Sequence, residues 1–326
     1  MNTKITGTGS FLPEKIVTNF DMEKLVDTQD AWIRERTGIA SRHISTGETV
    51  SSIAAKAAKE ALLMAGKQPG EVEMIIVATC SPEMLLPCCA CQVQSILGCS
   101  NAVAFDLNAA CSGFLFALNA ATAYIKTGLY KNALVIGAEV LSKIVDWTDR
   151  STCVLFGDGA GAAFLEATEE ENIGMLSLSQ GSDGARGMVL ACEDRDVVNP
   201  FTEKKEQILP GYVTMNGQEV YKFAVRQVPA SILDALNKAN LTVEEIDHFV
   251  LHQANIRIIE AVAKRLKVPM DKFPTNLERV GNMSSATIPV LLDEINRAGK
   301  LKKGDKLVMS GFGAGLTYGA GVYIWG

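Results

Sequence analysis

The chain has 326 residues, of which 48% are hydrophobic, and it carries a formal net charge of −6 at pH 7. Such an acidic chain lacks the basic footprint of nucleic-acid-binding proteins, so no nucleic-acid partner is expected. It contains no run of about 18 apolar residues that would span a bilayer, and its start, "MNTKITGTGSFLPEK", has no uninterrupted apolar signal region. With eight cysteines and no secretory signal, the expected location is the reducing cytoplasm.

Helical and strand-like patterns alternate along the chain. Residues 50–66, "VSSIAAKAAKEALLMAG", have apolar side chains at helical spacing. Short apolar runs typical of buried strands occur at 74–79 ("MIIVAT"), 133–138 ("ALVIGA"), 248–253 ("HFVLHQ") and 306–311 ("KLVMSG"). This alternation predicts an α/β fold in which sheets are sandwiched between helices. The polar stretches 168–174 and 191–207 are expected to be excursions from this core.

The chain also repeats itself at a spacing of 174 residues. The segment "EVEMIIVAT" resembles "EIDHFVLHQ", and "NAACSGF", which begins at Asn108, falls on "NMSSATI", which begins at Asn282. A spacing of 173 places Val135 of "ALVIGAE" on Val308 of "KLVMSGFG". We therefore predict two similar α/β halves, residues 1–170 and 171–326, related by a pseudo-two-fold axis. A site between the halves is expected.

Cys111 precedes the apolar segment 112–127, which is predicted to be a buried helix with Lys126 in its last turn and Gly128 after its end. A free cysteine is more often a small buried hydrophobe than a nucleophile. However, a thiol at the N-terminus of a helix lies near the positive end of the helix dipole, which favours the thiolate. A fall of one or two units from a pKa of about 8.5 would make the thiolate abundant at neutral pH. Cys111 is therefore a candidate nucleophile.

The three histidines are His43, His248 and His252. His252 lies at the end of a predicted strand, where such sheets present reactive groups, although a hydrogen-bonded core histidine is the commoner case. His248 lies about 13 Å back along the same strand, so we interpret it as structural. Asn282, in "GNMSSATI", is equally compatible with a helix N-cap. The glycine-rich loop 311–321 would let backbone N–H groups approach an oxyanion closely.

Segments distributed over nearly the whole chain resemble β-ketoacyl-acyl-carrier-protein synthases III, the initiating condensing enzymes of bacterial fatty acid synthesis. They are "TGTGSFLPEKIVTN", "TQDAWIRERTGI", "DLNAACSGF", "TDRSTCVLFGDGAGA", "HQANIRI", "GNMSSATIP" and "GFGAGLTYGA". The resemblance implies the thiolase-like fold, in which two duplicated α/β halves form a layered αβαβα sandwich. It also implies a Cys-His-Asn triad, here Cys111, His252 and Asn282, whereas the elongating condensing enzymes use Cys-His-His.

The family's chemistry follows from this resemblance. The cysteine thiolate attacks the thioester of a short acyl-CoA, and CoA leaves. The backbone N–H groups of Cys111 and Ala314 are implied to surround the oxyanion, and many relatives have glycine where Ala314 stands. Malonyl-acyl carrier protein then binds, and His252 Nε2 and the Asn282 amide donate to its thioester oxygen as CO2 leaves. The carbanion attacks the acyl thioester, so neither a metal nor a cofactor besides the CoA substrate is expected.

The resemblance also implies which residues bind the substrate. Trp32 and Arg36 have the i, i+4 spacing of one helical face, which an amphipathic helix that packs its tryptophan would share. Trp32 and Arg150 are implied to hold the adenine of CoA, Arg36 and Arg257 to face its phosphates, and Asn255 to bind the pantetheine.

The segment from Gln253 to Lys272 has five basic and two acidic residues in an otherwise acidic chain. Such a patch attracts an acidic partner, although a solvated helix face would have the same composition. The resemblance makes this segment the docking site of the acidic acyl carrier protein. The residues implied in docking are Gln253, Ala254, Asn255, Ile256, Arg257, Lys264 and Arg265.

The segment "PEMLLPCCACQVQ" contains Leu86 and the thiols Cys88, Cys89 and Cys91. In the family this loop reaches the acyl pocket of the partner subunit of a homodimer, and the residue at the Leu86 position helps to set the primer length. Cys88 and Cys91 have the spacing of a redox or zinc half-site, but a zinc site needs four ligands and no second pair is near, so no metal is expected.

Two alternatives stay open at this point. A polyketide-type starter synthase or another acyltransferase of the superfamily would use the same triad, and assays of malonyl-carrier decarboxylation with fatty-acid primers would distinguish it. A redox or non-enzymatic thiol protein built on Cys88 and Cys91 would be identified by zinc analysis and thiol titration. The sequence does not rank acetyl, branched and longer primers, and it does not separate primary fatty acid synthesis from a specialised pathway.

Overall fold

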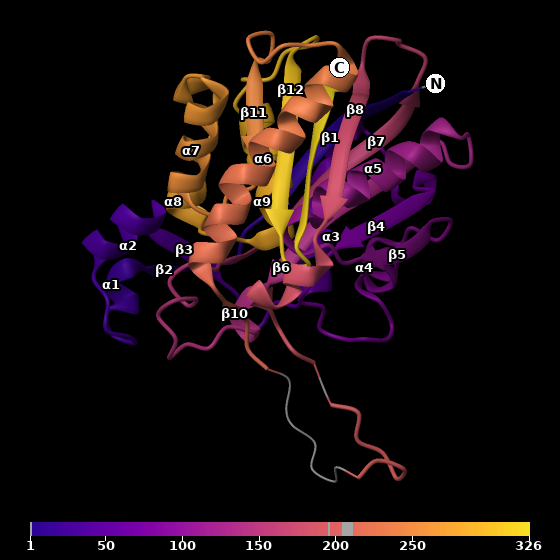
Figure 1. The fold of residues 1–326 in the computed structure, drawn as a ribbon. Coiled ribbons are helices and arrows are strands. Elements are labelled where there is room, and N and C mark those ends of the chain that lie inside the picture. Colours follow the sequence, from indigo (N-terminus) through magenta and orange to yellow (C-terminus); the bar gives the residue numbers. More distant parts are fainter. Residues whose placement is uncertain (1, 195, 204–210) are drawn as a thin grey trace.

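Two β-sheets organise the part of the chain that the computed structural model describes, namely residues 2–194, 196–203 and 211–326 (Figure 1). The first sheet consists, in spatial order, of β1 (Asn2–Phe11), β7 (Asp158–Thr168), β6 (Asn132–Val140), β4 (Met74–Ala78) and β5 (Val103–Leu107). The second consists of β8 (Gly174–Ser182), β13 (Thr317–Ile324), β12 (Lys306–Gly313) and β11 (His248–Leu251). The four strands predicted from apolar runs are thereby confirmed.

Helices cover the outer faces of both sheets and fill the space between them. Those on the first sheet are α3 (Val50–Ala65) and α4 (Cys89–Leu97), and those over the second are α6 (Gly217–Ala239) and α7 (Ile256–Leu266). The central layer is formed by α5 (Gly113–Lys126) and α9 (Thr287–Arg297), each of which contacts strands of both sheets. The layers therefore follow the order αβαβα, as the resemblance implied, and the two predicted helices are confirmed.

Small residues allow α3 to pack closely on the first sheet. Its buried face contains Ala54, Ala57 and Ala61, all fully buried. Opposite them, β1 has Gly9, where an added Cβ would lie only 2.2 Å from the carbonyl oxygen of Ala57. The helix backbone therefore rests almost directly on the strand, which accounts for the abundance of alanine and glycine.

The two sheets repeat the same order of elements. β1, β7, β6 and β4 correspond to β8, β13, β12 and β11, and α5 and α9 begin 174 residues apart. The correspondence extends to single residues, since Ala110 and Ser284 precede these helices with φ values of 46° and 47°. The repeat predicted from the sequence is confirmed. The chain changes sheet between Thr168 and Gly174, and the division into domains 1–170 and 171–326 stays a prediction.

The remaining elements are short. They are α1 (Asn19–Met22), α2 (Asp30–Thr37), α8 (Leu277–Val280), β2 (Lys15–Thr18) paired with β3 (Ser41–Ile44), and β9 (Leu190–Ala191) paired with β10 (Thr214–Met215). Residues 196–203, part of the excursion predicted at 191–207, extend away from the sheets (Figure 1), whereas residues 195 and 204–207 lie outside the described part. Among the described residues, no helix has both the length and the apolarity that crossing a bilayer requires.

Candidate active site

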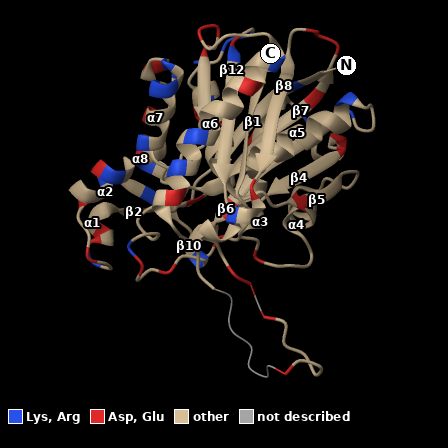
Figure 2. Cartoon of the chain, in the orientation of Figure 1, with Lys and Arg blue, Asp and Glu red and all other residues tan. Residues whose placement is uncertain are grey.

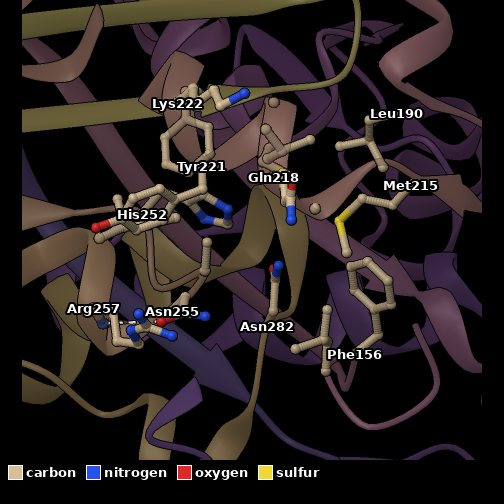
Figure 3. A pocket seen from close by; sticks show the side chains of 18 of the residues that line it. Phe156, Leu190, Met215, Gln218, Tyr221, Lys222, His252, Asn255, Arg257 and Asn282 are labelled. Atoms are coloured by element: carbon tan, nitrogen blue, oxygen red, sulfur yellow. Dashed lines mark hydrogen bonds between the residues drawn. The ribbon is translucent and has the colours of Figure 1, made fainter. Parts of the chain in front are cut away.

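A cavity of about 420 Å³ is lined by Cys111, His252 and Asn282 together. Figure 3 shows His252 and Asn282 at this cavity. A second cavity, of about 390 Å³, is also lined by Cys111. Phe156 and Leu190 contribute to both cavities, so they lie where the two meet. The Cys111 thiol is thus accessible from two spaces, which suits a group that receives one substrate part and presents it to another.

Cys111 is held in a 3-10 turn, Ala110–Ser112, immediately before α5. Gly313 of β12 packs directly against this turn, and a Cβ at Gly313 would lie 2.6 Å from the backbone nitrogen of Cys111. The hydroxyl of Thr317, on β13, donates to the carbonyl oxygen of Ala109 at 3.0 Å. The turn therefore depends on strands of the second half of the chain, which bring their glycine-rich loop to the thiol.

Burial determines the protonation state of Cys111. Cys111 is 7% exposed, and desolvation raises the pKa of its thiol to about 12, while a hydrogen bond from Ser284 opposes this rise. The expectation that the helix dipole makes the thiolate abundant at neutral pH is therefore wrong. Desolvation is the largest cause of this rise, because burial disfavours the charged thiolate.

His252 follows β11 and extends its pairing with β12, since its N–H donates to the carbonyl oxygen of Ser310 at 2.8 Å. Its Nδ1 lies 2.6 Å from the hydroxyl oxygen of Thr287, the first residue of α9. The ring contacts Phe312 edge to face, with centroids 5.4 Å apart. Burial lowers the pKa of His252 to about 3, so the imidazole is neutral at physiological pH.

Asn282 has a fixed orientation. Its backbone pairs with residues on either side of Phe156, because its N–H donates to Leu155 O at 2.9 Å and its carbonyl accepts from Gly157 N at 3.0 Å. Its side-chain oxygen accepts from the backbone N–H of Ser284 at 2.9 Å. The amide nitrogen is therefore the end that is left for the cavity, as Figure 3 shows.

The other two histidines lie apart from these cavities. His248, at the start of β11, has its Nε2 3.6 Å from Asp305, in keeping with its structural interpretation. His43 Nδ1 lies 2.6 Å from the carbonyl oxygen of Pro13. Neither lines the two Cys111 cavities.

The residues implied in CoA binding gather at the first cavity and beside it. Arg36, Asn255 and Arg257 line the cavity. The guanidinium groups of Arg36 and Arg150 lie over the Trp32 ring at 5.7 and 5.2 Å from its centroid. The Asn255 side chain accepts from Arg257 N and donates to Arg36 O, both at 2.9 Å, so it joins α7 to α2.

Most of the residues implied in carrier-protein docking lie on or before α7. Arg257, Lys264 and Arg265 are exposed. Figure 2 shows basic residues, in blue, toward both ends of α7. Ala254 and Ile256 are partly buried. The helix thus presents a basic surface beside the mouth of the first cavity.

Gln253 does not belong to that surface. It is fully buried, its amide donates to Leu251 O at 2.8 Å, and its oxygen accepts from Asn276 N at 3.2 Å. The prediction that Gln253 contacts the carrier protein is wrong, because its polar atoms hold the turn between β11 and α7 inside the protein.

Sequence reasoning missed the contribution of α6. Gln218, Tyr221 and Lys222, from its first two turns, line the first cavity (Figure 3). The Lys222 amine lies 2.8 Å from Glu219. An amphipathic helix is visible in this part of the sequence, but no signal there indicates that its first turns face Cys111.

The second cavity has apolar walls near the thiol. Leu141, Ile144 and Val213 line it, together with Cys111 and Ala314. Leu86 lines neither cavity within one chain. It is 87% exposed, in a loop that also exposes Met84 and Leu85.

Comparisons with known proteins identify the family that the chain resembles. The family model described as 3-Oxoacyl-[acyl-carrier-protein (ACP)] synthase III matches residues 105–184, and the model of its C-terminal part matches residues 236–325. A beta-ketoacyl-[acyl-carrier-protein] synthase III of Clostridium novyi (strain NT) is 52% identical over 324 residues, covering 99% of each chain.

Two solved structures are also similar. The 3-oxoacyl-[acyl-carrier-protein] synthase III from Aquifex aeolicus VF5 has a TM-score of 0.92 and 44% identity, over 99% of this chain and 100% of that one. The priming beta-ketosynthase from the R1128 polyketide biosynthetic pathway has a TM-score of 0.91 and 34% identity, over 99% and 96% of the chains.

Proposed function

The chain belongs to the β-ketoacyl-acyl-carrier-protein synthase III family, and from this premise we propose that it condenses an acyl-CoA primer with malonyl-acyl carrier protein. The products are β-ketoacyl-carrier protein, CoA and CO2, and the reaction initiates fatty acid biosynthesis. The observation that carries the proposal is that Cys111, His252 and Asn282 line one cavity. The proposed compartment is the cytoplasm, where free thiols stay reduced.

In the first half-reaction, the Cys111 sulfur attacks the acyl thioester and CoA leaves. The apolar second cavity receives the acyl chain, since it opens at the thiol. The backbone N–H groups of Cys111 and Ala314 are the proposed oxyanion donors, of a kind that each contribute about 3 kcal/mol to transition-state stabilisation. CoA extends through the first cavity, whose mouth carries the cationic side chains of Arg36 and Arg257.

In the second half-reaction, the malonyl thioester occupies the space that CoA has left. The Asn282 amide nitrogen donates to its oxygen, and His252 Nε2 donates if Nδ1 accepts from the Thr287 hydroxyl. This tautomer requires the Thr287 hydroxyl to turn its proton to Nδ1, at 2.6 Å, and away from Ser284 O, to which it otherwise donates at 3.0 Å. Both donors stabilise the enolate as CO2 departs, and the carbanion then attacks acyl-Cys111.

The test of this function is a panel of acyl-CoA primers assayed with malonyl-acyl carrier protein. Release of CO2 and formation of β-ketoacyl-carrier protein with fatty-acid primers support the proposal. A protein that transfers acyl groups without consuming malonyl-carrier protein would instead be an acyltransferase.

A polyketide-type priming synthase is the second candidate. The observation that favours it is the likeness to the R1128 priming beta-ketosynthase over nearly the whole chain. The same primer panel separates the two functions, because each predicts a different preferred primer and carrier protein.

The basic surface of α7 provides a test of carrier docking. Charge reversal by Lys264→Glu with Arg265→Glu is expected to raise KM for malonyl-carrier protein about tenfold, because steering of an acidic partner depends on opposite charge. Acylation of Cys111 by acyl-CoA should change little. Raising salt from 0.1 to 1 M shortens the Debye length from about 10 to about 3 Å. In wild type this should remove most of the electrostatic attraction that lowers KM for malonyl-carrier protein.

The matched control for this test is Lys300→Glu with Lys302→Glu, an exposed pair remote from both cavities. It should leave KM unchanged. If salt raises KM for malonyl-carrier protein equally in the α7 variant and in wild type, α7 is only a solvated face.

The exposed apolar segments support a homodimer. Met84, Leu85 and Leu86 are consecutive and exposed. The edge strand β5 nearby begins with the exposed Val103 and pairs with β4 on one side only. An unpaired strand edge beside exposed apolar side chains is typical of an interface. In the proposed dimer, Leu86 reaches the second cavity of the partner subunit.

Leu86→Phe is expected to shift primer preference toward shorter acyl chains, by about tenfold in the kcat/KM ratio for long against short primers, because the larger ring fills the end of the acyl space. The measurement is competition between acyl-CoA primers, with Leu129→Phe as an exposed control outside the loop. A fully active monomer in sedimentation, or an unchanged primer preference, would contradict this role.

A further inference from the structure

A buried arginine packs beside the backbone that carries Phe156 and Asn282, two residues of the first cavity. Arg42, on β3, is fully buried and lines neither of the two cavities. One terminal nitrogen of its guanidinium donates to Val154 O at 2.6 Å, and the other donates to Asn19 Oδ1 at 2.9 Å. We propose that Arg42 is a positioning residue, which holds Asn282 in the geometry that malonyl decarboxylation requires.

The side chain of Arg42 rests against the glycine that follows Phe156 and the glycine that precedes Asn282. A Cβ at Gly157 would lie 3.1 Å from the Cβ of Arg42, and a Cβ at Gly281 would lie at the same distance from it. Gly281 also has a φ of 68°, a conformation that other residues rarely adopt. The arginine stem is therefore in close contact with the backbone next to both cavity residues.

Asn282 is joined to its neighbouring segment by one isolated parallel bridge. Its N–H donates to Leu155 O at 2.9 Å, and its carbonyl oxygen accepts from Gly157 N at 3.0 Å. The bridge lies outside the strands of both sheets, so no longer ladder of hydrogen bonds fixes it. Val154, whose carbonyl oxygen accepts from the guanidinium, directly precedes Leu155. Arg42 therefore holds the segment one residue away from the bond that places Asn282.

The guanidinium itself has a fixed place. The side chain of Asn19, which accepts from it, donates in turn to Asp30 Oδ1 at 2.9 Å and to Ile39 O at 2.8 Å. The same guanidinium nitrogen also lies 3.4 Å from Val17 O, on the strand β2 that pairs with β3. Val154 is thus held from a point that several hydrogen bonds secure.

Arg42 is a charged donor without a carboxylate partner. Burial lowers its pKa to about 10, so the group stays protonated at neutral pH. Among the described residues, its Nε has no hydrogen-bond partner, and its other nitrogens donate only to amide and carbonyl oxygens. A charged donor forms stronger hydrogen bonds than a neutral one. Because burying such a cation costs folding free energy, its value is expected in the segments that its bonds hold in place.

This role deepens the proposed decarboxylation and rests on it. The Asn282 amide is the proposed donor to the malonyl oxygen, whereas the proposed donors for acyl transfer are the backbone N–H groups of Cys111 and Ala314. No hydrogen bond of Arg42 reaches the turn or the loop that carries those two groups. A displacement of about 1 Å can lower a rate about 100-fold. Loss of Arg42 should therefore slow decarboxylation and spare acyl transfer.

The test is a double-mutant cycle on decarboxylation of malonyl-carrier protein. Arg42→Met, which fills similar space without donating, should lower kcat about 10- to 100-fold and leave KM within about twofold, because the α7 surface is unchanged. Acylation of Cys111 should change less than about threefold. In the Asn282→Ala background, Arg42→Met should have almost no further effect, since the residue that it positions is gone. A merely structural role would instead lower the rate in both backgrounds.

Hydrogen exchange provides an arm of the test that needs neither CoA nor carrier protein. In Arg42→Met, the amides of Gly157 and Asn282, which form the bridge, should exchange about tenfold faster, while those of β4 should not change. The measurement is mass spectrometry of peptides that contain each amide. A wild type that does not decarboxylate malonyl-carrier protein would refute the proposed function. Unchanged exchange at the bridge would refute the positioning role, whatever the reaction is.

The matched control is Asn132→Leu, at the start of β6. Asn132 is buried, accepts from Glu73 N and donates to Glu71 O, both at 2.9 Å, and lines neither cavity. This variant should lower the unfolding temperature without changing exchange at the bridge or the ratio of the two half-reactions. If Arg42→Met does not fold, Arg42→Lys takes its place in both arms, with an expected loss of about three- to tenfold. Equal loss of both half-reactions, or losses that multiply in the cycle, would overturn the proposal.

Discussion

Replacement of Cys111 by serine is expected to reduce condensation by about three orders of magnitude or more, the largest loss of any single substitution considered. A buried serine hydroxyl ionises far less readily than a thiol, so the nucleophile is lost while the fold is preserved. Condensation with malonyl-carrier protein measures the loss. Mass spectrometry after treatment of wild type with acyl-CoA should find the acyl group on the peptide that contains Cys111.

The matched control is Cys99→Ser, another buried thiol, which should retain the activity of the wild type. An acyl group found on Cys88, Cys89 or Cys91 would show that the nucleophile belongs to the cysteine cluster at the start of α4 and not to Cys111. It would also favour the alternative of a thiol protein built on that cluster.

Replacement of His252 or Asn282 by alanine is expected to lower malonyl decarboxylation about 100-fold, because each variant removes a donor to the developing enolate oxygen. Acylation of Cys111 should be affected much less, since that oxyanion is proposed to lie at the backbone of Cys111 and Ala314. The two half-reactions are measured separately, by CO2 release and by the acyl-Cys111 adduct. His248→Ala, in the same strand, is the control and should leave decarboxylation unchanged.

The pH dependence of decarboxylation provides a second test of the proposed role of His252. With its pKa lowered to about 3 by burial, His252 stays neutral from pH 5 upward, so decarboxylation should show no inflection near pH 6.5. An inflection near pH 6.5 that disappears in His252→Ala would mean that the imidazole titrates in this range. Equal loss of both half-reactions in His252→Ala and Asn282→Ala would contradict the division of labour.

Local sequence signals were sufficient for the α/β class and for the helices and strands that they marked. The helices around Ala57 and after Cys111 follow from the periodicity of their apolar residues, and the strands before His252 and around Val308 from short apolar runs. The repeat of 174 residues predicted a site between the two halves, and the family resemblance assigned Cys111, His252 and Asn282 to it. A backbone pattern of this kind depends on neighbours in sequence, so it can be predicted without coordinates.

The tertiary structure decided what depends on contacts between distant segments. In the sequence, Gln253 is a polar residue of a basic segment. In the structure, its side-chain amide hydrogen-bonds the backbone of Leu251 and Asn276 inside the protein, before α7. The side chains of Gln218 and Tyr221 reach the cavity only because α6 crosses the second sheet. Neither fact has a signal in sequence spacing, because the partners lie on other elements.

The protonation state of Cys111 shows most clearly the difference between what the sequence predicts and what the tertiary structure decides. Its place before an apolar helix, which the sequence predicted, favours a thiolate through the helix dipole. Its burial beneath Gly313 and beside Ser284 is a property of the assembled halves, and it raises the pKa of the thiol to about 12. Sequence thus singled out Cys111, His252 and Asn282, whereas packing added the residues of α6 and set the pKa values of the buried groups, because the cost of desolvating an ion depends on every atom that excludes water from it.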